Sequence, residues 1–198
     1  ITVGSYISFG TYEQDNNTAN GQEPIEWLVL AEENGCVLVI SRYGLDEQDY
    51  NEDMTPTIWE TCTLRNWLNN DFLNTAFSSS EQAAIPTVTI SADENPTRSI
   101  EAGNTTQDKV FLLSITEADK YFMMDSAIQC KPTAYAEAQG ASVFSSGFTW
   151  WWLRSLANEP MRAAMVSFNG EIDATGIYTY LPATVRPALW IDLELVVP

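Results

Sequence analysis

Few residues in this sequence could do chemistry, because the chain has no histidine and only three cysteines, Cys36, Cys62 and Cys130. Without histidine, Ser-His-Asp and Cys-His triads, histidine general bases and histidine-bound zinc are excluded. The cysteine spacing matches no metal motif or redox pair, and the apolar run around Cys36 favours a packing role for that residue. An enzyme of this sequence would have to use carboxylates, an oxygen-bound metal, tyrosine, lysine or a lone cysteine.

Carboxylates are the abundant reactive groups, since 27 acidic residues stand against 9 basic ones and the net charge is -18. Carboxylates with separated pKa values can perform acid–base catalysis, and a run of oxygen ligands can hold calcium. One such run contains Asp46, Asp49, Asn51 and Asp53. It lacks the glycine and the final glutamate of an EF-hand loop, and so many acids fall close together by chance. We therefore interpret most acids as solvated and predict no cofactor, with calcium left open by this run.

The scarce basic residues are more informative, because Arg65, Arg154 and Arg186 lie within apolar or aromatic segments. A guanidinium in such surroundings must be paired or stacked. One interpretation is a clamp for an anion or a carboxylate. The other is an internal tie between the sheet and the first helix, which we favour because these arginines lie beside tryptophan and leucine.

The acid surplus also limits the partners of the chain. Phosphate backbones require a basic footprint on the protein, so we expect no nucleic acid partner. Anionic membranes are poor partners for the same reason, and no apolar stretch approaches the ~20 residues of a membrane-spanning helix. Cations, basic proteins and neutral polymers such as glycans remain.

The elements that must position these residues are short. Two Asn-Gly pairs, at residues 34–35 and 169–170, lie between strand-like runs and predict β-hairpins, because both turn positions favour positive φ. The second hairpin joins residues 162–168 to 171–174. Residues 185–191 predict a closing strand, and Pro187 within it indicates an edge or a bulge.

Helical signals are fewer. The spacing of the apolar residues over 61–77 predicts a helix with one buried stripe. Ser114 and Glu117 form a capping box, which predicts a second helix start, and residues 134–139 predict a short helix ended by Gly140. We expect one α+β domain over 1–198, with a twisted antiparallel sheet, two or three helices and long loops.

The C-terminal third carries the candidate binding residues. In the run 150–152 of three tryptophans, strand alternation places Trp151 on the face opposite the other two, so we expect at least one exposed ring. An exposed tryptophan is a platform for a sugar or an anchor for a protein. The hairpin and loops that follow mix tyrosine, asparagine and charged residues, as adaptable recognition surfaces do. The candidates are Trp151, Asn158, Glu159, Arg162, Asn169, Glu171, Asp173, Tyr178 and Tyr180. The alternative is that they are ordinary solvated hairpin residues.

Four segments together resemble a family of uncharacterised bacterial domains common in gut Firmicutes, which is similar to the C-type-lectin-like fold in its formylglycine-generating-enzyme variant. They are Pro24–Leu30, Leu64–Asn69, Trp151–Ser155 and Val185–Leu189. The resemblance implies a twisted antiparallel sheet beside two helices, with a ligand surface on the C-terminal hairpin and loops. The Glu-Pro-Asn and Trp-Asn-Asp motifs of calcium-dependent lectins and the cysteine pair of the oxidases are missing, so neither activity carries over.

These observations predict a non-catalytic ligand-binding module, extracellular or at the cell surface, that recognises a glycan or a protein through its C-terminal hairpin and loops. One alternative is a carboxylate-based or metal-assisted hydrolase, which two converging acids of raised pKa in a deep pocket would favour. Another is a structural docking domain of a larger surface protein. The lack of a histidine or cysteine motif favours a protein that is not an enzyme.

Overall fold

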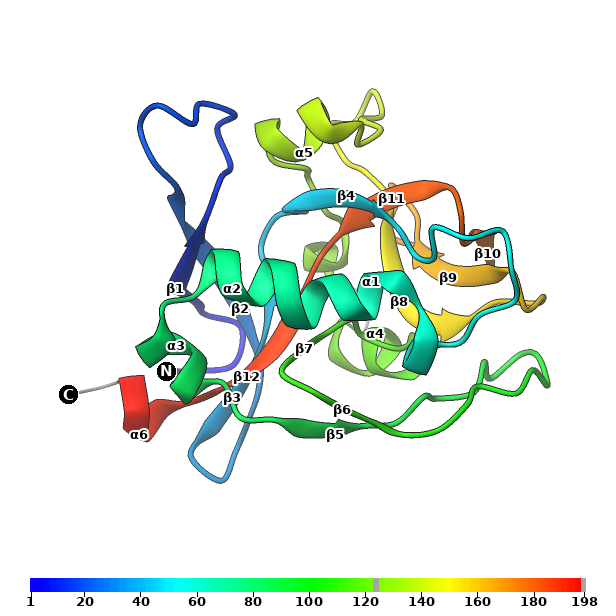
Figure 1. The fold of residues 1–198 in the computed structure, drawn as a ribbon, viewed down its shortest axis with the longest axis horizontal. Coiled ribbons are helices and arrows are strands. Elements are labelled where there is room, and N and C mark those ends of the chain that lie inside the picture. Colours follow the sequence, from blue (N-terminus) through cyan, green and yellow to red (C-terminus); the bar gives the residue numbers. More distant parts are fainter. Residues whose placement is uncertain (123–124, 197–198) are drawn as a thin grey trace.

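The computed structural model describes residues 1–122 and 125–196, and strands dominate it (Figure 1). Two five-stranded sheets and a two-stranded ribbon are joined by short helices. Nearly all strand pairs are antiparallel, which confirms the predicted mixture of antiparallel strands with few helices. Among the described helices, none is long and apolar enough to cross a bilayer.

The first sheet has the order β1-β2-β3-β12-β7 and brings both ends of the chain together. Its strands are β1 (Tyr6–Tyr12), β2 (Glu23–Glu33), β3 (Cys36–Ser41), β12 (Ala188–Asp192) and β7 (Val110–Phe111). Asn34 and Gly35 turn between β2 and β3 with φ of 52° and 81°, so the first predicted hairpin is confirmed.

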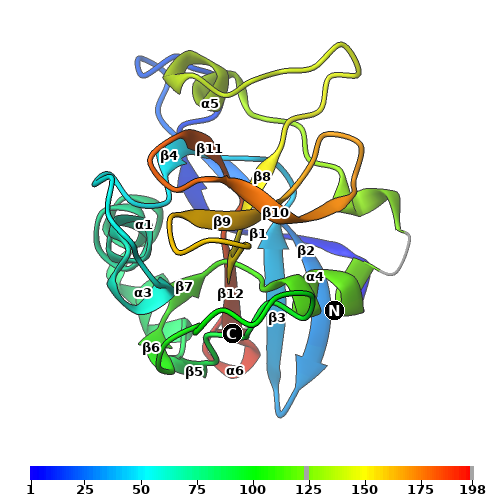
Figure 2. The ribbon, with the colours of Figure 1, turned by 90° about the vertical axis from the view of Figure 1, so that its right-hand side faces the viewer.

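The second sheet has the order β10-β9-β8-β11-β4. Its strands are β10 (Ile172–Tyr178), β9 (Arg162–Val166), β8 (Trp151–Leu156), β11 (Pro182–Val185) and β4 (Asp46–Asp49). Only β11 and β8, among the described pairs, run parallel. The β9–β10 hairpin lies at one end of the molecule in Figure 1 and faces the viewer in Figure 2, where its strands run across β2 and β3.

The predicted closing strand over 185–191 is instead divided between the two sheets. Val185 ends β11 in the second sheet, and Ala188 begins β12, an interior strand of the first. The backbone carbonyl of Pro187 accepts a hydrogen bond from Ser41 at 3.0 Å, while its missing N–H is not needed in either ladder. Arg186 and Pro187 therefore form a crossover, and the prediction of an edge strand or bulge is wrong.

The helix predicted over 61–77 is present as a nearly continuous run of short segments. It comprises η1 (Trp59–Thr61), α1 (Thr63–Trp67), the π turn η2 (Leu68–Phe72) and α2 (Leu73–Ala76). Leu64, Leu68 and Phe72 are buried along one stripe, as the spacing predicts. The remaining elements are α3 (Ser79–Ala84), β5 (Val88–Ile90), β6 (Thr106–Asp108), α4 (Ile115–Phe122), η3 (Ser126–Ile128), α5 (Ala134–Gln139) and α6 (Leu193–Val196).

Arg65, which is partly buried, and Arg154 connect these elements. The Arg65 Nε donates to the Asp108 carboxylate at 2.7 Å and ties α1 to β6. Arg154 is almost fully buried, and it donates to the Leu112 carbonyl at 2.8 Å and to both carboxylate oxygens of Glu117 at the start of α4. The structural interpretation is confirmed for Arg65 and Arg154, although Arg154 binds α4 and not the first helix.

Candidate functional site

The predicted site residues on the C-terminal hairpin fall into two groups at opposite ends of it. Asn158, Glu159, Arg162, Tyr178 and Tyr180 lie at the open end, where β9 begins and β10 finishes. Asn169 and Glu171 lie in the turn at the tip, and Asp173 lies between the two groups. Because β9 has five residues and a strand rises about 3.3 Å per residue, the two ends lie roughly 15 Å apart.

Trp151 is fully buried, which corrects the prediction of an exposed ring at this position. Strand β8 lies between β9 and β11, and both faces of the sheet are covered, so Trp152 is buried as well. The Trp151 Nε1 donates to the Ile128 carbonyl at 3.0 Å, and its ring packs against Phe122. Of the three tryptophans, Trp150 alone is partly exposed.

A stack of one cation and two rings covers the open end of the hairpin. The Arg162 guanidinium lies 4.1 Å from the centre of the Tyr178 ring. Tyr178 stacks on Tyr180 with 5.2 Å between ring centres and 18° between planes. Alternation explains this order, because the intervening Thr179 points inward and is fully buried. These half-exposed rings are rigid contact surfaces next to a fixed positive charge.

The same end of the hairpin holds buried polar atoms that make no hydrogen bond within the described residues. Among the described residues, four buried side-chain nitrogen or oxygen atoms lack a hydrogen bond, and three of them are Asn158 Oδ1, Arg162 Nε and Thr179 Oγ1. Backbone hydrogen bonds join Ala157 to Arg162 and Thr179 to Met161, each at 2.9 Å, so the three belong to one small region. Arg162 Nε lies 3.7 Å from the Glu159 carboxylate, while the other two atoms require water or a ligand, because an unsatisfied buried polar group costs about 1–3 kcal/mol.

A neighbouring loop extends this surface. The backbone N–H of Asn51 donates to the Thr179 carbonyl at 2.9 Å, and that of Thr57 donates to the Pro160 carbonyl at 3.1 Å. The loop between them exposes Met54, and Leu181 is exposed beyond Tyr180. We call this region, comprising the loop 51–57, the turn 157–162 and residues 178–181, the open-end surface.

Asp173 is a structural residue of the hairpin as well as a charge beside Arg162. Its Oδ1 accepts hydrogen bonds from the hydroxyl of Thr175 at 2.6 Å and from the backbone of Gly176 at 3.1 Å. Burial alone would raise the pKa of this carboxyl, but these hydrogen bonds and the charge of Arg162 outweigh it and lower the pKa. Asp173 therefore stays ionised and holds the bulge between β9 and β10 in shape.

The tip of the hairpin differs from the predicted turn and contains an aromatic cluster that the sequence did not reveal. Gly170 has φ of 87°, while Asn169 does not adopt a positive φ and instead accepts a hydrogen bond from the backbone of Glu171 at 3.1 Å. Phe168 stacks on Phe144 at 4.0 Å, and Phe144 contacts Trp150 edge-on at 5.4 Å. The partners in this cluster come from separate loops, so no local pattern could predict it.

Two neighbouring acids with raised pKa, Asp46 and Glu47, lie on β4 but do not converge. Asp46 accepts a hydrogen bond from the Tyr12 hydroxyl at 2.5 Å, and Glu47 accepts one from the Thr184 hydroxyl at 3.0 Å. Burial raises the pKa of both carboxyls, that of Glu47 to about 7. Consecutive side chains of a strand point to opposite faces, so the pair cannot act together on one bond as a hydrolase requires.

Oxygen ligands for a cation occur away from the predicted run. The side-chain oxygen of Asn51 accepts a hydrogen bond from the Thr63 backbone N–H, and the Asp46 carboxylate accepts one from the Tyr12 hydroxyl. These two members of the run therefore bind protein donors. Glu13, Asp15 and Glu23 each place a carboxylate oxygen within 4.8 Å of the others, an arrangement common among acids without an ion.

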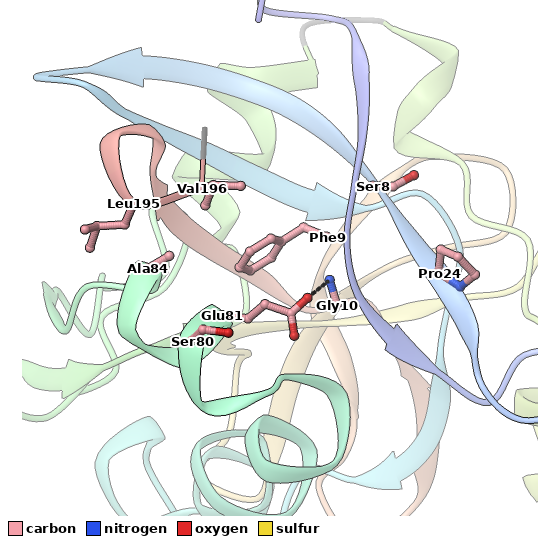
Figure 3. Close-up of a pocket in the computed structure, with 9 residues that line it drawn as sticks. All are labelled: Ser8, Phe9, Gly10, Pro24, Ser80, Glu81, Ala84, Leu195 and Val196. Atoms are coloured by element: carbon pink, nitrogen blue, oxygen red, sulfur yellow. Dashed lines mark hydrogen bonds between the residues drawn. The ribbon is translucent and has the colours of Figure 1, made fainter. Parts of the chain in front are cut away.

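A hollow near the chain termini lies far from the hairpin (Figures 1 and 3). This open pocket of about 410 Å³ is bordered by β1, α3 and α6. Its single carboxylate, Glu81, binds the Gly10 N–H at 3.2 Å and caps α3 through Ser78. Leu195 and Val196 are exposed at its rim, and it contains none of the predicted site residues.

Comparison with known proteins gives one match. The family described as "Domain of unknown function (DUF6273)" matches residues 34–193, which include both sheets except β1 and β2. No curated protein and no solved structure matches the chain.

Proposed function

The chain belongs to the DUF6273 family, and we propose that it is a non-catalytic binding module, acting at the cell surface or outside the cell, that recognises a glycan or a protein. Its ligand contacts the open-end surface of the C-terminal hairpin. The observation that carries this proposal is the stack of Arg162, Tyr178 and Tyr180 at the same end of the hairpin as Asn158 Oδ1 and Thr179 Oγ1, two buried atoms without a hydrogen bond among the described residues.

The chemistry of the open-end surface supports ligand recognition. Tyrosine and arginine contribute most to binding energy at protein interfaces, because each offers a large contact area together with hydrogen bonds. The same rings can stack against the C–H face of a sugar, while Asn158, Glu159 and Arg162 offer donors and acceptors to its hydroxyls. The exposed side chains of Met54 and Leu181 lie at the edge of this surface.

We further propose that the fold is a C-type-lectin-like variant. The support is the resemblance of the tryptophan and arginine motifs, together with the antiparallel sheets beside a helical segment and a C-terminal hairpin that lies outermost in its sheet (Figure 2). In that fold the C-terminal hairpin and loops carry the ligand, which matches the position of the open-end surface.

The proposal is tested with a glycan array and with capture of protein ligands from the native surroundings, each repeated with three variants. Tyr178→Ala and Arg162→Ala remove the stack, and we expect each to weaken binding about 30-fold, the effect of losing a residue worth about 2 kcal/mol. Phe168→Ala is the matched control, since it removes an exposed ring at the other end of the same hairpin.

Each result has a definite meaning. Binding lost in Tyr178→Ala and Arg162→Ala but kept in Phe168→Ala supports the open-end surface. Binding lost only in Phe168→Ala moves the site to the tip. If no glycan on the array binds and a protein is specifically captured, the ligand is a protein and not a glycan. Binding that none of the three variants affects refutes a site on the hairpin.

A further inference from the structure

A second pocket, beside the crossover between the two sheets, gathers three of the nine basic residues of the chain. Arg42, Lys131 and Arg186 all line this cavity of about 180 Å³. Although the chain has 27 acidic residues, none of the residues that line the pocket is acidic. Positive charge is therefore concentrated at one place on a molecule whose net charge is -18.

Arg186 forms the inner wall of the pocket and is only 2% exposed. Its Nε donates to the Ser41 carbonyl at 2.8 Å, its Nη1 donates to the Ala127 carbonyl at 3.0 Å, and its guanidinium lies 5.0 Å from the Trp151 ring. Unlike Arg65 and Arg154, it pairs with no carboxylate among the described residues. A buried charge without a counter-ion is costly, and burial lowers the pKa of this guanidinium.

Among the described residues, one nitrogen of Arg186 has no hydrogen-bond partner. Nε and Nη1 donate to backbone carbonyls, whereas Nη2 makes no hydrogen bond within residues 1–122 and 125–196. Since Nε and Nη1 are held by backbone carbonyls, the guanidinium cannot turn away from the pocket. It presents Nη2 in a fixed orientation.

The other two cations lie at the mouth of the pocket against aromatic rings. The Arg42 guanidinium is 4.8 Å from the Tyr6 ring and 5.2 Å from the Tyr43 ring, and it pairs with the half-exposed Glu26 at 3.0 Å. Lys131 Nζ lies 5.5 Å from the Phe148 ring, and in the part of the chain that the structure describes it contacts no carboxylate. The mouth thus combines positive charge with flat apolar walls.

We propose that this pocket binds the carboxylate of a small organic acid, at a site separate from the open-end surface. The carboxylate accepts hydrogen bonds from Arg186 Nη2 and Lys131 Nζ, and the aromatic rings at the mouth contact the rest of the ligand. A planar carboxylate suits a fixed guanidinium edge. The cavity is smaller than the roughly 300–1,000 Å³ typical of drug-sized ligands, which limits the ligand to about one ring.

Calorimetric titration of the whole chain tests this proposal with four probes, namely benzoate, glucuronate, the neutral benzamide and inorganic phosphate. We expect at least one of the two carboxylates to bind: benzoate if the pocket accepts an aromatic ring, and glucuronate if it accepts a sugar ring. Benzamide and phosphate should bind at least about tenfold more weakly. Lys131→Met is expected to weaken carboxylate binding about tenfold. Lys120→Met is the matched control, since Lys120 is an exposed lysine that also lies over a ring, 4.7 Å from Tyr121.

Arg186 donates hydrogen bonds to three backbone carbonyls, so its replacement can unfold the chain. Arg42→Met therefore serves as the second variant, because Arg42 is exposed. Its binding loss should be smaller than that of Lys131→Met, because Glu26 already offsets part of its charge. The proposal is overturned if neither carboxylate binds, if benzamide or phosphate binds equally well, or if Lys131→Met and Arg42→Met keep the affinity of the unchanged protein.

Discussion

The clearest prediction on stability concerns Glu47, a buried carboxyl on β4. Its side chain accepts a hydrogen bond from the Thr184 hydroxyl at 3.0 Å, and Thr184 pairs in turn with Thr149 at 2.9 Å. Burial, together with the charges of Asp46 and Asp49, raises the pKa of Glu47 to about 7 from an ordinary value of 4.5. The folded protein therefore binds a proton at Glu47 under conditions where the unfolded chain has lost it.

This difference makes the free energy of unfolding depend on pH. The contribution of Glu47 is fully present below pH 4.5 and is lost as pH rises through about 7. A difference of one in pKa corresponds to about 1.4 kcal/mol, so the loss is about 3 kcal/mol at most. Burial also raises the pKa of Asp46, so Asp46 changes stability in the same direction. Glu47→Gln cannot ionise and keeps an oxygen for Thr184, so it should be more stable than the unchanged protein at pH 8 and equal to it at pH 4.5.

Urea unfolding followed by circular dichroism between pH 4.5 and 8 measures the effect. Glu32→Gln, at an exposed position of β2, removes the same charge and controls for the general repulsion of an acidic chain. Glu47→Gln should flatten the pH dependence and Glu32→Gln should leave it nearly unchanged. Equal effects of the two variants, or a Glu47→Gln protein less stable at pH 8, would refute the reasoning.

Four further substitutions test the packing and the internal hydrogen bonds. Gly176→Ala should destabilise the protein by about 3 kcal/mol, because φ of Gly176 is +57° and a Cβ there would lie 1.9 Å from the Ala163 carbonyl oxygen. Thermal unfolding measures this loss of stability, and an unchanged melting temperature would contradict the geometry. Arg154→Met should cost about 3 kcal/mol in urea unfolding by leaving Glu117 without its partner, and Glu117→Gln should then cost less in that variant than alone. Ser78→Ala should cost about 1 kcal/mol by removing the α3 cap, and unaltered amide exchange in α3 would contradict that role.

Local chemistry made several elements predictable. Asn34-Gly35 supplies both positive φ values of the first turn, and the capping box of Ser114 and Glu117 is present at the start of α4. Gly140, with φ of 122°, ends α5 as expected. Ser78 and Glu81 form another capping box at the start of α3. Each of these signals lies within a few residues of the element it specifies.

Features that depend on distant strands were not predictable in the same way. Strand alternation predicts that Trp151 lies on the face of the sheet opposite Trp150 and Trp152. The exposure of its ring depends on what covers that face, and both faces of β8 are covered. Residues 185–191 are mostly apolar and predict one strand, yet the two halves of this run enter different sheets. Sequence periodicity reports the direction of a side chain and not its neighbours.

The candidate sites show the same distinction. Arg162, Tyr178 and Tyr180 were identified from composition, while their stacking required the hairpin register. The cationic pocket draws Arg42 and Lys131 from segments about ninety residues apart, and neither has a distinctive neighbourhood in the sequence. Among these three cations, only Arg186 could be singled out from the sequence, because it lies in an apolar segment.

The crossover at Arg186 and Pro187 also fixes the order of events during synthesis. One short segment supplies β11 to one sheet and β12 to the other, and Thr184 pairs with Glu47, 137 positions away. Neither sheet can be completed until residues 182–192 have left the ribosome, so β3 of the first hairpin stays without its second partner strand until then. Contacts so distant in sequence slow folding and prolong exposure of unpaired strands. A nascent chain of this protein is therefore most vulnerable to aggregation just before its last strand arrives.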